Sequence, residues 1–337
     1  MNHFKSKNDV YIIAEIGGNH EGDFEYAKQL TRLAAESGAD AVKFQVYTGD
    51  SLVNSKYDPV RNKHFKKFEL SSAEYIELAL LCKELDITFM ASIWDIEAFN
   101  YMDKYMPIYK IGSGDMTAYN LIKKMVQTGK PIILSTGLST YSEVENVVDF
   151  INSLDSTYIT DKKLSLLQCT SMYPIPDEDA NLNVMMKYKE NFKIPIGYSD
   201  HTEGMDAIEI AVAMGAEIIE IHFTDSREGK EFRDHKVSAT KNEIQELIIK
   251  IKKIRTLQGS FEKKPTTSEI ESGHTKSFRR GVFAKRNLKA GEIIKEDDLI
   301  TLRPFEGVGA DKFYELVGKK LIHDLKILET IKDKYEL

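Results

Sequence analysis

Cysteine is nearly absent from this sequence: Cys82 and Cys169 are the only two among 337 residues, and no Cys-x-x-Cys pair occurs. Two cysteines are too few for a disulfide framework, so we expect a reducing, cytoplasmic setting. The sequence also has no apolar run of membrane-spanning length, and its polar start, MNHFKSKNDV, lacks a signal-peptide core. We therefore expect neither a membrane span nor export.

A surplus of basic residues is missing as well. Lys and Arg number 46 against 53 Asp and Glu, which gives a net charge of −7. This balance excludes a broad electrostatic footprint for nucleic acid or for an anionic membrane. An anionic ligand would therefore need a local basic site.

Eight short apolar runs are present in the first 260 residues, and polar residues stand at the downstream end of each. The runs are Tyr11–Ile16, Ala41–Val46, Ile87–Ile93, Ile108–Ile111, Pro131–Ser135, Leu164–Cys169, Ile194–Ser199 and Glu217–Phe223. Each gap between runs is long enough for a helical crossover, which indicates a parallel sheet. Eight such units predict a (β/α)8 TIM barrel, whose active site lies at the C-terminal strand ends.

Between the runs, apolar residues recur at the spacing expected of a helix with one buried face. We predict helices over Glu25–Ser37, Ser72–Glu84, Thr202–Gly215 and Lys241–Leu257. The barrel domain would then span residues 1–259.

After Gly259 the sequence changes character. Residues 260–277 are polar, without an apolar period, and are interpreted as a linker. Residues 278–337 form a compact second domain rich in short strands, predicted at Gly281–Ala284, Glu292–Ile294, Leu299–Leu302 and Lys320–Leu325.

Lys43 and Lys110 end runs two and four, within apolar surroundings where a lysine costs free energy unless it has a partner. Together with Ser113, Ser135 and Ser199 they could hold an anion at the barrel mouth. The alternative is that both lysines are ordinary solvated surface residues.

His201 and His222 end runs seven and eight, which are adjacent in a closed barrel. Two neutral imidazoles there would make half of a divalent-metal site, completed by water and substrate oxygens. The alternative is a pair of polar core histidines. Glu15 and Glu220 could position the metal or transfer protons, and Glu220 faces the same way as His222 because strand side chains alternate.

Several segments together resemble the bacterial sialic acid (nonulosonate) synthase family. They are AEIGGNHEGD (14–23), AVKFQ (41–45), YKIGSGD (109–115), LSTG (134–137), YPIP (173–176), GYSDHT (197–202) and IEIHFT (219–224). The tail that begins KRNLKAGEII resembles that family's C-terminal antifreeze-like (SAF) domain. The resemblance covers nearly the whole chain.

The resemblance implies an enzyme, a transferase similar to N-acetylneuraminate synthase. It would condense phosphoenolpyruvate with an N-acylated amino-hexose aldehyde into a nine-carbon 2-keto acid, with cleavage of the C–O bond of phosphoenolpyruvate. The histidines would bind Mn2+, Mg2+ or Co2+, which could polarise the aldehyde and activate water.

The same resemblance assigns roles to single residues. Glu15, Lys43, Lys110, His201, Glu220 and His222 would be catalytic. The substrate-binding candidates are Gln45, Ser92, Ser113, Asp115, Ser135, Tyr173, Ser199, Asp234 and Arg303. Arg303 would reach the partner's active site in a domain-swapped homodimer.

Four departures from the family pattern concern the acceptor sugar. They are Ala91-Ser92-Ile93-Trp94, Asp115 in place of a glutamate, Ser171 before the YP motif, and Phe232-Arg233-Asp234 after run eight. The sequence does not choose between neuraminic, legionaminic and pseudaminic acid products.

Two other function classes are open. One is a phosphoenolpyruvate-dependent synthase that acts on a phosphorylated sugar, for which Arg227, Lys230 and Arg233 are the only candidate phosphate ligands. The other is a non-catalytic carbohydrate-binding protein with the same fold.

Overall fold

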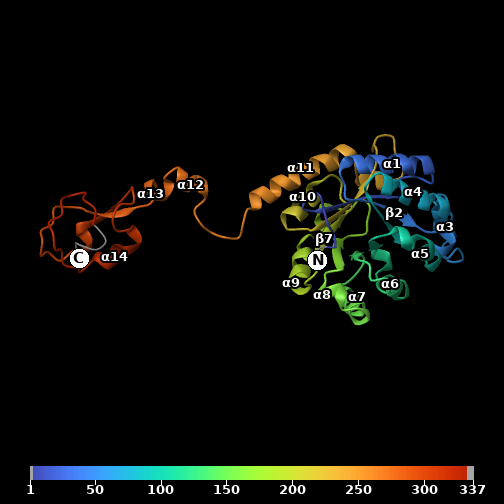
Figure 1. Cartoon of the computed structure of the whole chain (residues 1–337), viewed down its shortest axis with the longest axis horizontal. Helices are drawn as coiled ribbons and strands as arrows, with labels where there is room; N and C mark the ends of the chain where they lie inside the picture. Colours follow the sequence, from blue (N-terminus) through green and yellow to red (C-terminus); the bar gives the residue numbers. More distant parts are fainter. Residues whose placement is uncertain (1–2, 332–337) are drawn as a thin grey trace. The chain divides into compact units, whose positions relative to one another are not determined.

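The computed structural model describes residues 3–331, and these divide into two compact units within Met1–Gly259 and Ser260–Leu337. Figure 1 shows the elements of each unit in sequence colours. The end of the predicted second domain, residues 332–337, lies outside the described part of the chain.

The first unit is a closed barrel of eight parallel strands. The strands are β1 (Tyr11–Gly17), β2 (Ala41–Val46), β3 (Thr88–Ile93), β4 (Tyr109–Ile111), β5 (Ile132–Ser135), β6 (Leu164–Cys169), β7 (Ile196–Asp200) and β8 (Ile218–Phe223). Each strand pairs with the next, and β1 also pairs with β8, from Tyr11 opposite Ile218 to Glu15 opposite His222. A short strand, β9 (Ser238–Ala239), pairs with the end of β8. The predicted (β/α)8 barrel is confirmed.

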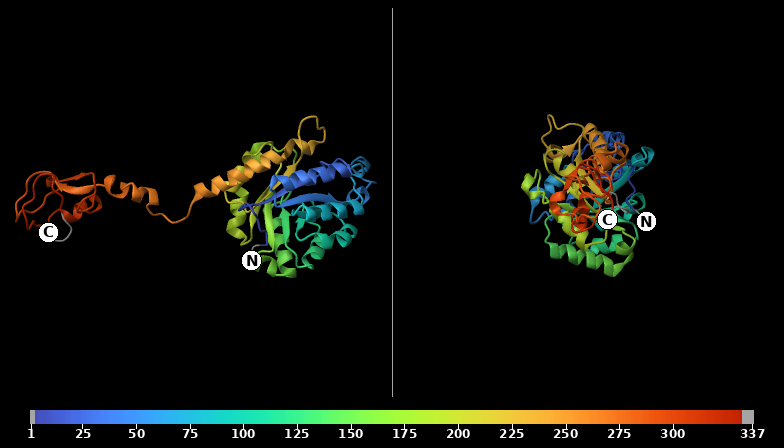
Figure 2. Two further views of the ribbon diagram at one scale, coloured as in Figure 1. Left: turned by 45° about the horizontal axis from the view of Figure 1, so that its top comes forward. Right: turned by 90° about the vertical axis from the view of Figure 1, so that its left-hand side faces the viewer.

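Helices surround the barrel (Figure 2). They are α1 (Phe24–Ser37), α2 (Gly49–Leu52), α3 (Pro59–Lys66), α4 (Ser72–Glu84), α5 (Ile96–Met102), α6 (Tyr119–Val126), α7 (Tyr141–Leu154), α8 (Thr157–Thr160), α9 (Asn183–Asn191), α10 (Asp206–Ala213) and α11 (Lys241–Gln258), with short 3-10 turns η1 (Asp103–Tyr105), η2 (Ser113–Asp115), η3 (Asp177–Asp179) and η4 (Arg233–Val237). The predicted helix over Ser72–Glu84 is found with the same ends. The one predicted over Thr202–Gly215 is shorter, because the residues before Asp206 form turns and bends.

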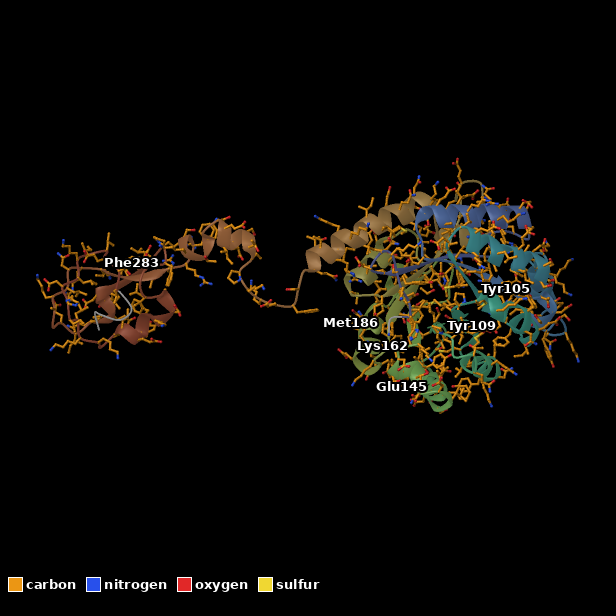
Figure 3. The ribbon with its side chains drawn as sticks, viewed as in Figure 1. Tyr105, Tyr109, Glu145, Lys162, Met186 and Phe283 are labelled. Atoms are coloured by element: carbon orange, nitrogen blue, oxygen red, sulfur yellow. The ribbon has the colours of Figure 1, made fainter. Side chains whose placement is uncertain are left out.

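Side chains on the strands alternate between two cores. Outward-facing residues pack against the helices; Tyr109, for example, is fully buried and stacks on Phe99 of α5. Away from the strands, Glu145 and Lys162, which are labelled in Figure 3, have exposed side chains on the barrel unit. Inward-facing residues at the N-terminal strand ends form a second, apolar core that includes Tyr11, Ile13 and Ile218.

The same inward-facing positions become polar farther along each strand. On β1, Tyr11 and Ile13 are followed two residues later by Glu15, and on β8 Ile218 is followed by Glu220 and His222. Because strand side chains repeat every two residues, these polar groups point into the barrel above the apolar core. The fold therefore places a polar interior at the C-terminal strand ends.

The second unit is small and has its own apolar core, which includes Val282, Leu299 and Leu321. Its elements are α12 (Thr267–Glu271), α13 (His274–Ser277), β10 (Gly281–Ala284), η5 (Glu296–Asp298), β11 (Leu299–Leu302), η6 (Ala310–Lys312) and α14 (Phe313–Leu316). β10 and β11 pair in an antiparallel sheet.

Two strands predicted in this unit are wrong as continuous strands. Glu292–Ile294 and Lys320–Leu325 contribute only the single bridges Ile293–Lys320 and Leu288–Leu325. Glycines with positive φ, Gly291 and Gly318, turn the backbone close to the Ile293–Lys320 bridge. The predicted linker also contains α12 and α13, whose residues are largely exposed.

Within residues 3–331, no helix has both the length and the apolar character needed to cross a membrane.

Candidate active site

Two lysines and two glutamates meet inside the barrel at its C-terminal end. They are Glu15 on β1, Lys43 on β2, Lys110 on β4 and Glu220 on β8, and we call them the charged cluster. Their side chains are only 2% to 8% exposed. Buried charges are costly unless they are paired, so the four groups stabilise one another.

Lys43 and Glu15 form the tightest pair of the cluster. Lys43 Nζ lies 2.6 Å from Glu15 Oε2 and 3.9 Å from Glu220 Oε2. The other oxygen of Glu15 accepts a 3.1 Å hydrogen bond from Gln45 Nε2, and Lys43 donates to Ser92 Oγ at 3.4 Å. Gln45 and Ser92 therefore fix the orientation of the pair.

Lys110 is held on the other side of Glu220. Its Nζ donates to Ser135 Oγ at 2.7 Å and to the carbonyl of Ile111 at 3.1 Å, and lies 3.5 Å from Glu220 Oε1. Ser199 donates to that same carboxylate oxygen at 2.9 Å. The predicted residues Lys110, Ser135, Ser199 and Glu220 are thus brought into one network.

The pKa values in the cluster reflect burial and pairing. Burial raises the pKa of Glu15 to about 6, against the opposing effect of Lys43. Burial also disfavours the ionised form of Glu220, but Lys110 and Lys43 outweigh it and hold its pKa at about 2. Burial lowers the pKa of Lys110, whereas at Lys43 the nearby Glu15 and Glu220 overcome burial and raise the pKa. An incoming anion must therefore compete with two carboxylates for the lysines.

The two predicted histidines lie next to each other, with ring centroids 5.4 Å apart. His201 Nδ1 donates to the carbonyl of Thr170 at 2.8 Å, which leaves the lone pair of its Nε2 available. His222 Nδ1 is buried and has no hydrogen-bond partner among the described residues. Burial lowers the pKa of His222 well below its usual range, and the neighbouring His201 adds to this effect. The ring of His222 is therefore neutral.

The neutral His222 and the adjacent His201 fit a divalent-metal half-site. Although burial opposes it, the nearby Cys169 raises the pKa of His201, so a metal would compete with a proton for that ring. Among residues 3–331, no group of three or more His, Cys, Asp or Glu is arranged to hold a metal.

Tyr173, predicted to bind substrate, packs over both histidines. Its ring centroid is 4.0 Å from that of His201 and 5.5 Å from that of His222. The guanidinium of Arg233 lies 4.6 Å from the same ring, and Arg233 Nε is 2.9 Å from Asp234 Oδ1. The loop after β8 thereby brings Asp234 toward the histidines.

Asp115 lies after β4, beside an aromatic group. Burial raises the pKa of Asp115 to about 6, and a hydrogen bond with Trp94 opposes that rise. Trp94 stacks on Tyr47 with ring centroids 5.0 Å apart and meets Phe65 edge-on. Nearby, Ser113 Oγ accepts a 3.0 Å hydrogen bond from the backbone N–H of Gly137.

Arg303 belongs to the second unit, where it is exposed and its guanidinium lies over the ring of Phe278. The structure describes the two units separately, so the predicted contact of Arg303 with a barrel site stays a prediction.

Two residues of this region had no predicted role in it. Cys169 is buried with its Sγ 3.8 Å from His201 Nδ1, and its place as the last residue of run six was the available signal. Asn19 donates from its amide to the carbonyl of Phe223 and to Ser238 Oγ, which ties the loop after β1 to the end of β8. Nothing in the sequence pattern points to that contact, because it joins segments far apart in the chain.

Comparison with protein families identifies both units. Residues 30–263 match the NeuB family and residues 279–334 match the SAF domain.

Individual relatives span nearly the full chain. The N,N'-diacetyllegionaminic acid synthase of Campylobacter jejuni is 35% identical, covering 96% of this chain and 98% of that protein. The human N-acetylneuraminate-9-phosphate synthase is 31% identical, covering 96% and 92%. The crystal structure of an N-acetylneuraminic acid synthetase from Leptospira borgpetersenii, in complex with citrate, superimposes with a TM-score of 0.71 at 32% identity, over 79% of this chain and 90% of that one. On the extent of these matches, this chain belongs to the NeuB family and carries a C-terminal SAF domain.

Proposed function

We propose that this protein is a nonulosonic acid synthase. It condenses phosphoenolpyruvate with an N-acylated amino-hexose aldehyde into a nine-carbon 2-keto acid and releases phosphate. The observation that carries the proposal is the charged cluster at the C-terminal end of a closed barrel, with Lys43 and Lys110 buried in a protein of net charge −7. The synthase names of its relatives support the reaction class.

The two lysines are proposed to hold the carboxylate and phosphate of phosphoenolpyruvate. Ser92 and Ser135 already accept hydrogen bonds from Lys43 and Lys110, so both ammonium groups are positioned before an anion arrives. Ser113 lies at the same end of the barrel and adds a neutral donor, while Ser199, whose hydroxyl proton is donated to Glu220, acts on the anion through that carboxylate. Such preorganisation reduces the entropic cost of binding.

Glu15 and Glu220 are proposed to handle protons. Glu15, with its raised pKa, is suited to hold and release a proton near neutral pH, while Gln45 keeps its carboxylate fixed. Glu220 stays ionised between the lysines and orients them. C3 of phosphoenolpyruvate attacks the aldehyde carbon, water adds at C2, and the C–O bond to phosphate breaks.

His201 and His222 are proposed to hold Mn2+, Mg2+ or Co2+. When bound there, such an ion would polarise the sugar aldehyde and acidify a water molecule. Tyr173 covers both rings and excludes bulk solvent from them.

Asp115 and Asp234 are proposed to bind hydroxyl groups of the sugar, with Arg303 of a partner chain completing the site in a domain-swapped homodimer. All three basic residues that could serve a phosphorylated sugar are already paired. Arg227 binds Glu243 through two hydrogen bonds, Lys230 lies 3.4 Å from Asp225, and Arg233 pairs with Asp234. A phosphorylated acceptor would have to compete with these carboxylates for the three basic residues.

The decisive experiment offers the purified protein phosphoenolpyruvate and a panel of N-acylated hexosamines, each with and without a 6-phosphate, and identifies products by mass spectrometry. We expect a 2-keto acid from unphosphorylated acceptors, and with 18O in the bridging position of phosphoenolpyruvate the label should leave with phosphate. Products from phosphorylated sugars alone, or no condensation at all, would contradict the proposal.

A further inference from the structure

The loop after β8 carries Asp234, which is proposed to bind the acceptor sugar. We call residues 224–237 the β8 loop and residues 18–23 the β1 loop. Near the start of the β8 loop, Asp225 accepts a 2.6 Å hydrogen bond from the hydroxyl of Tyr26 on α1. The part of the loop that carries Asp234 is held differently, by side chains of the β1 loop.

The first connection between the two loops runs through Ser238 to the backbone of Asp234. Asn19 Nδ2 donates to Ser238 Oγ at 2.8 Å, and that hydroxyl donates to the carbonyl of Asp234 at 2.7 Å. All three residues are buried. Because burial strengthens hydrogen bonds by excluding water, these two bonds restrain the backbone that carries the Asp234 carboxylate.

The second connection is made by His235, the residue after Asp234. Its Nδ1 lies 2.7 Å from Thr224 Oγ1, and its Nε2 lies 3.2 Å from Glu21 Oε1. Burial lowers the pKa of His235 against the opposing hydrogen bond with Glu21, so the ring is neutral and carries one N–H. Because a carboxylate only accepts, Nε2–H donates to Glu21, and Nδ1 accepts from the hydroxyl of Thr224. The ring of His235 is therefore fixed on both sides.

The β1 loop is well suited to anchor these bonds. Three backbone hydrogen bonds of 2.8 to 2.9 Å close successive turns within residues 16–23. Gly18 also lies against the β8 loop, since a Cβ built there would be 3.1 Å from the ring of Phe232. The β1 loop thus contacts the chain on both sides of Asp234, at Phe232 before it and at His235 and Ser238 after it.

We propose that Glu21 and His235 are positioning residues for acceptor binding, and that the bond between them holds the Asp234 carboxylate toward the sugar. This role rests on the proposed function, which assigns Asp234 to the acceptor. Neither Glu21 nor His235 belongs to the charged cluster that is proposed to hold phosphoenolpyruvate. Their removal should therefore weaken the use of one substrate and spare the other.

Steady-state kinetics of Glu21→Ala tests this role. We expect the KM for the acceptor sugar to rise roughly 2- to 10-fold, the range for one hydrogen bond, while kcat and the KM for phosphoenolpyruvate stay unchanged. Glu21→Gln should restore the acceptor KM, because its amide oxygen still accepts from Nε2–H of His235. When Asp234 is already replaced by alanine, Glu21→Ala should have no further effect. A rise in both KM values, no rescue by Glu21→Gln, or the same loss without Asp234 would overturn the positioning role.

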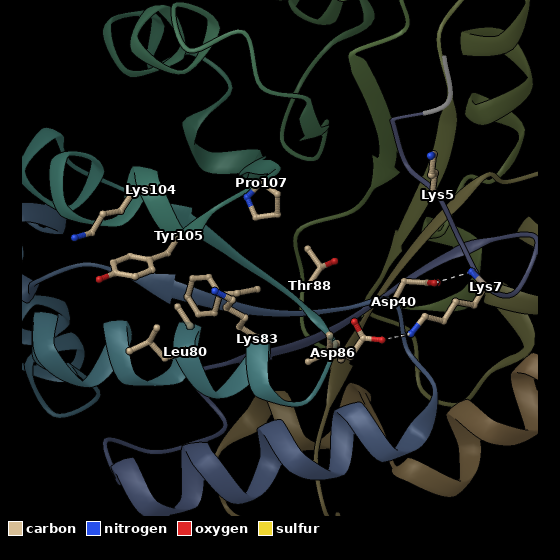
Figure 4. Close-up of a pocket in the computed structure, with 13 residues that line it drawn as sticks. Lys5, Lys7, Asp40, Leu80, Lys83, Asp86, Thr88, Lys104, Tyr105 and Pro107 are labelled. Carbon is tan, nitrogen blue, oxygen red and sulfur yellow. Dashed lines mark hydrogen bonds and ion pairs between the residues drawn. The ribbon is translucent and has the colours of Figure 1, made fainter.

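Asp86→Ala is the matched control. Asp86, like Glu21, is an acidic residue with positive φ, and it pairs with Lys7 at 3.4 Å. It lies at the opposite end of the barrel, shortly before β3, where it lines the pocket of about 620 Å³ shown in Figure 4. This variant should keep both KM values. An acceptor KM raised as much as in Glu21→Ala would overturn the proposal, because the effect would then not depend on the β8 loop.

Hydrogen–deuterium exchange of the full-length protein separates this role from the proposed reaction. In Glu21→Ala, the amides of residues 232–238 should exchange faster than in the unmodified protein, whereas those of residues 225–230, near Tyr26, should not. Unchanged exchange would overturn the restraint even in an active enzyme. Faster exchange in a protein that condenses no sugar would uphold the restraint on Asp234 and reject the proposed function alone.

Discussion

Lys110 touches Ser135, Ile111 and Glu220 at once, so its removal should have a specific effect. We expect Lys110→Ala to raise the KM for phosphoenolpyruvate while leaving sugar binding little changed. The loss of one charge-assisted hydrogen bond corresponds to about 1.5–3 kcal/mol, or roughly 10- to 150-fold. Steady-state kinetics with each substrate varied in turn checks this. Lys124→Ala is the control, because Lys124 is an exposed lysine of α6. An unchanged dependence on phosphoenolpyruvate would place the anion elsewhere.

The metal half-site gives a second residue-scale prediction. We expect excess chelator to abolish activity and added Mn2+ or Mg2+ to restore it. His201→Ala and His222→Ala should each lose bound metal, measured by elemental mass spectrometry, while circular dichroism shows an intact fold. His323→Ala, an exposed histidine of the second unit, should keep both metal and activity. Full turnover of metal-free protein would refute the half-site.

His20 should make stability depend on pH. It is buried, its Nδ1 accepts a 3.1 Å hydrogen bond from the N–H of Gly22, and burial lowers its pKa from 6.5 to about 4. Because the folded-state pKa is below the unfolded one, this contribution is fully present above about pH 6.5 and is lost as pH falls toward 4. Urea denaturation should show a loss of roughly 3 kcal/mol over this interval. His20→Asn should flatten that part of the profile, and a profile unchanged by the substitution would remove the role of His20.

At this scale, the sequence could predict which residues share the barrel interior but not which of them touch. The two-residue repeat along a strand places Glu15, Lys43 and Glu220 on inward positions, and Lys43 and Glu15 do meet. By contrast, the packing of Arg233 on Tyr173 joins two long loops. No periodic pattern governs loop conformation, so such contacts had to come from the structure.

Strands were the easier elements to predict in the barrel. Each apolar run is flanked by helices that bury its outer face, so burial on both faces made the runs continuous and easy to recognise. The second unit offers no such cover. Its segments around Ile293 and Leu325 form single bridges, and two adjacent apolar residues alone could not reveal that the strand pairing is limited to one bridge.

Gly197 on β7 shows how closely adjacent strands pack. A Cβ built there would lie 2.1 Å from the carbonyl oxygen of Ile218 and 2.6 Å from Leu167 Cδ2. Because a neighbouring backbone cannot move aside easily, Gly197→Ala should destabilise the barrel by about 3 kcal/mol or more. Thermal unfolding checks this against Gly114→Ala, where a Cβ meets nothing within 4 Å. Similar melting temperatures for the two variants would contradict the expected clash.

For the molecule as a whole, the barrel unit should fold without the second unit. It contains all eight barrel strands and its own core, and α11 ends at Gln258. We expect a chain that ends at Gly259 to unfold cooperatively, yet to lose most synthase activity because Arg303 is missing. Calorimetry and the condensation assay measure the two properties. Full activity of the shortened chain would exclude a catalytic contribution from the SAF domain.

A mixture of two inactive chains tests whether Arg303 acts across a dimer. In a heterodimer of Arg303→Ala and Lys110→Ala chains, action in trans places both defects in one site and leaves the other site intact. Activity should then return after subunit exchange. If the arginine acts within its own chain, every site carries one defect and exchange restores nothing, even when native mass spectrometry confirms heterodimers.

The pairing of β1 with β8 also has a consequence for how the chain folds during synthesis. Tyr11 is opposite Ile218, so β1 cannot pair with β8 until the ribosome has added about 200 more residues. Until then the incomplete sheet has two edge strands, β1 and the strand made most recently. Their unpaired backbone groups can form hydrogen bonds with other chains. We expect ring closure to be a late folding step with high contact order, and fragments that end before β8 to aggregate.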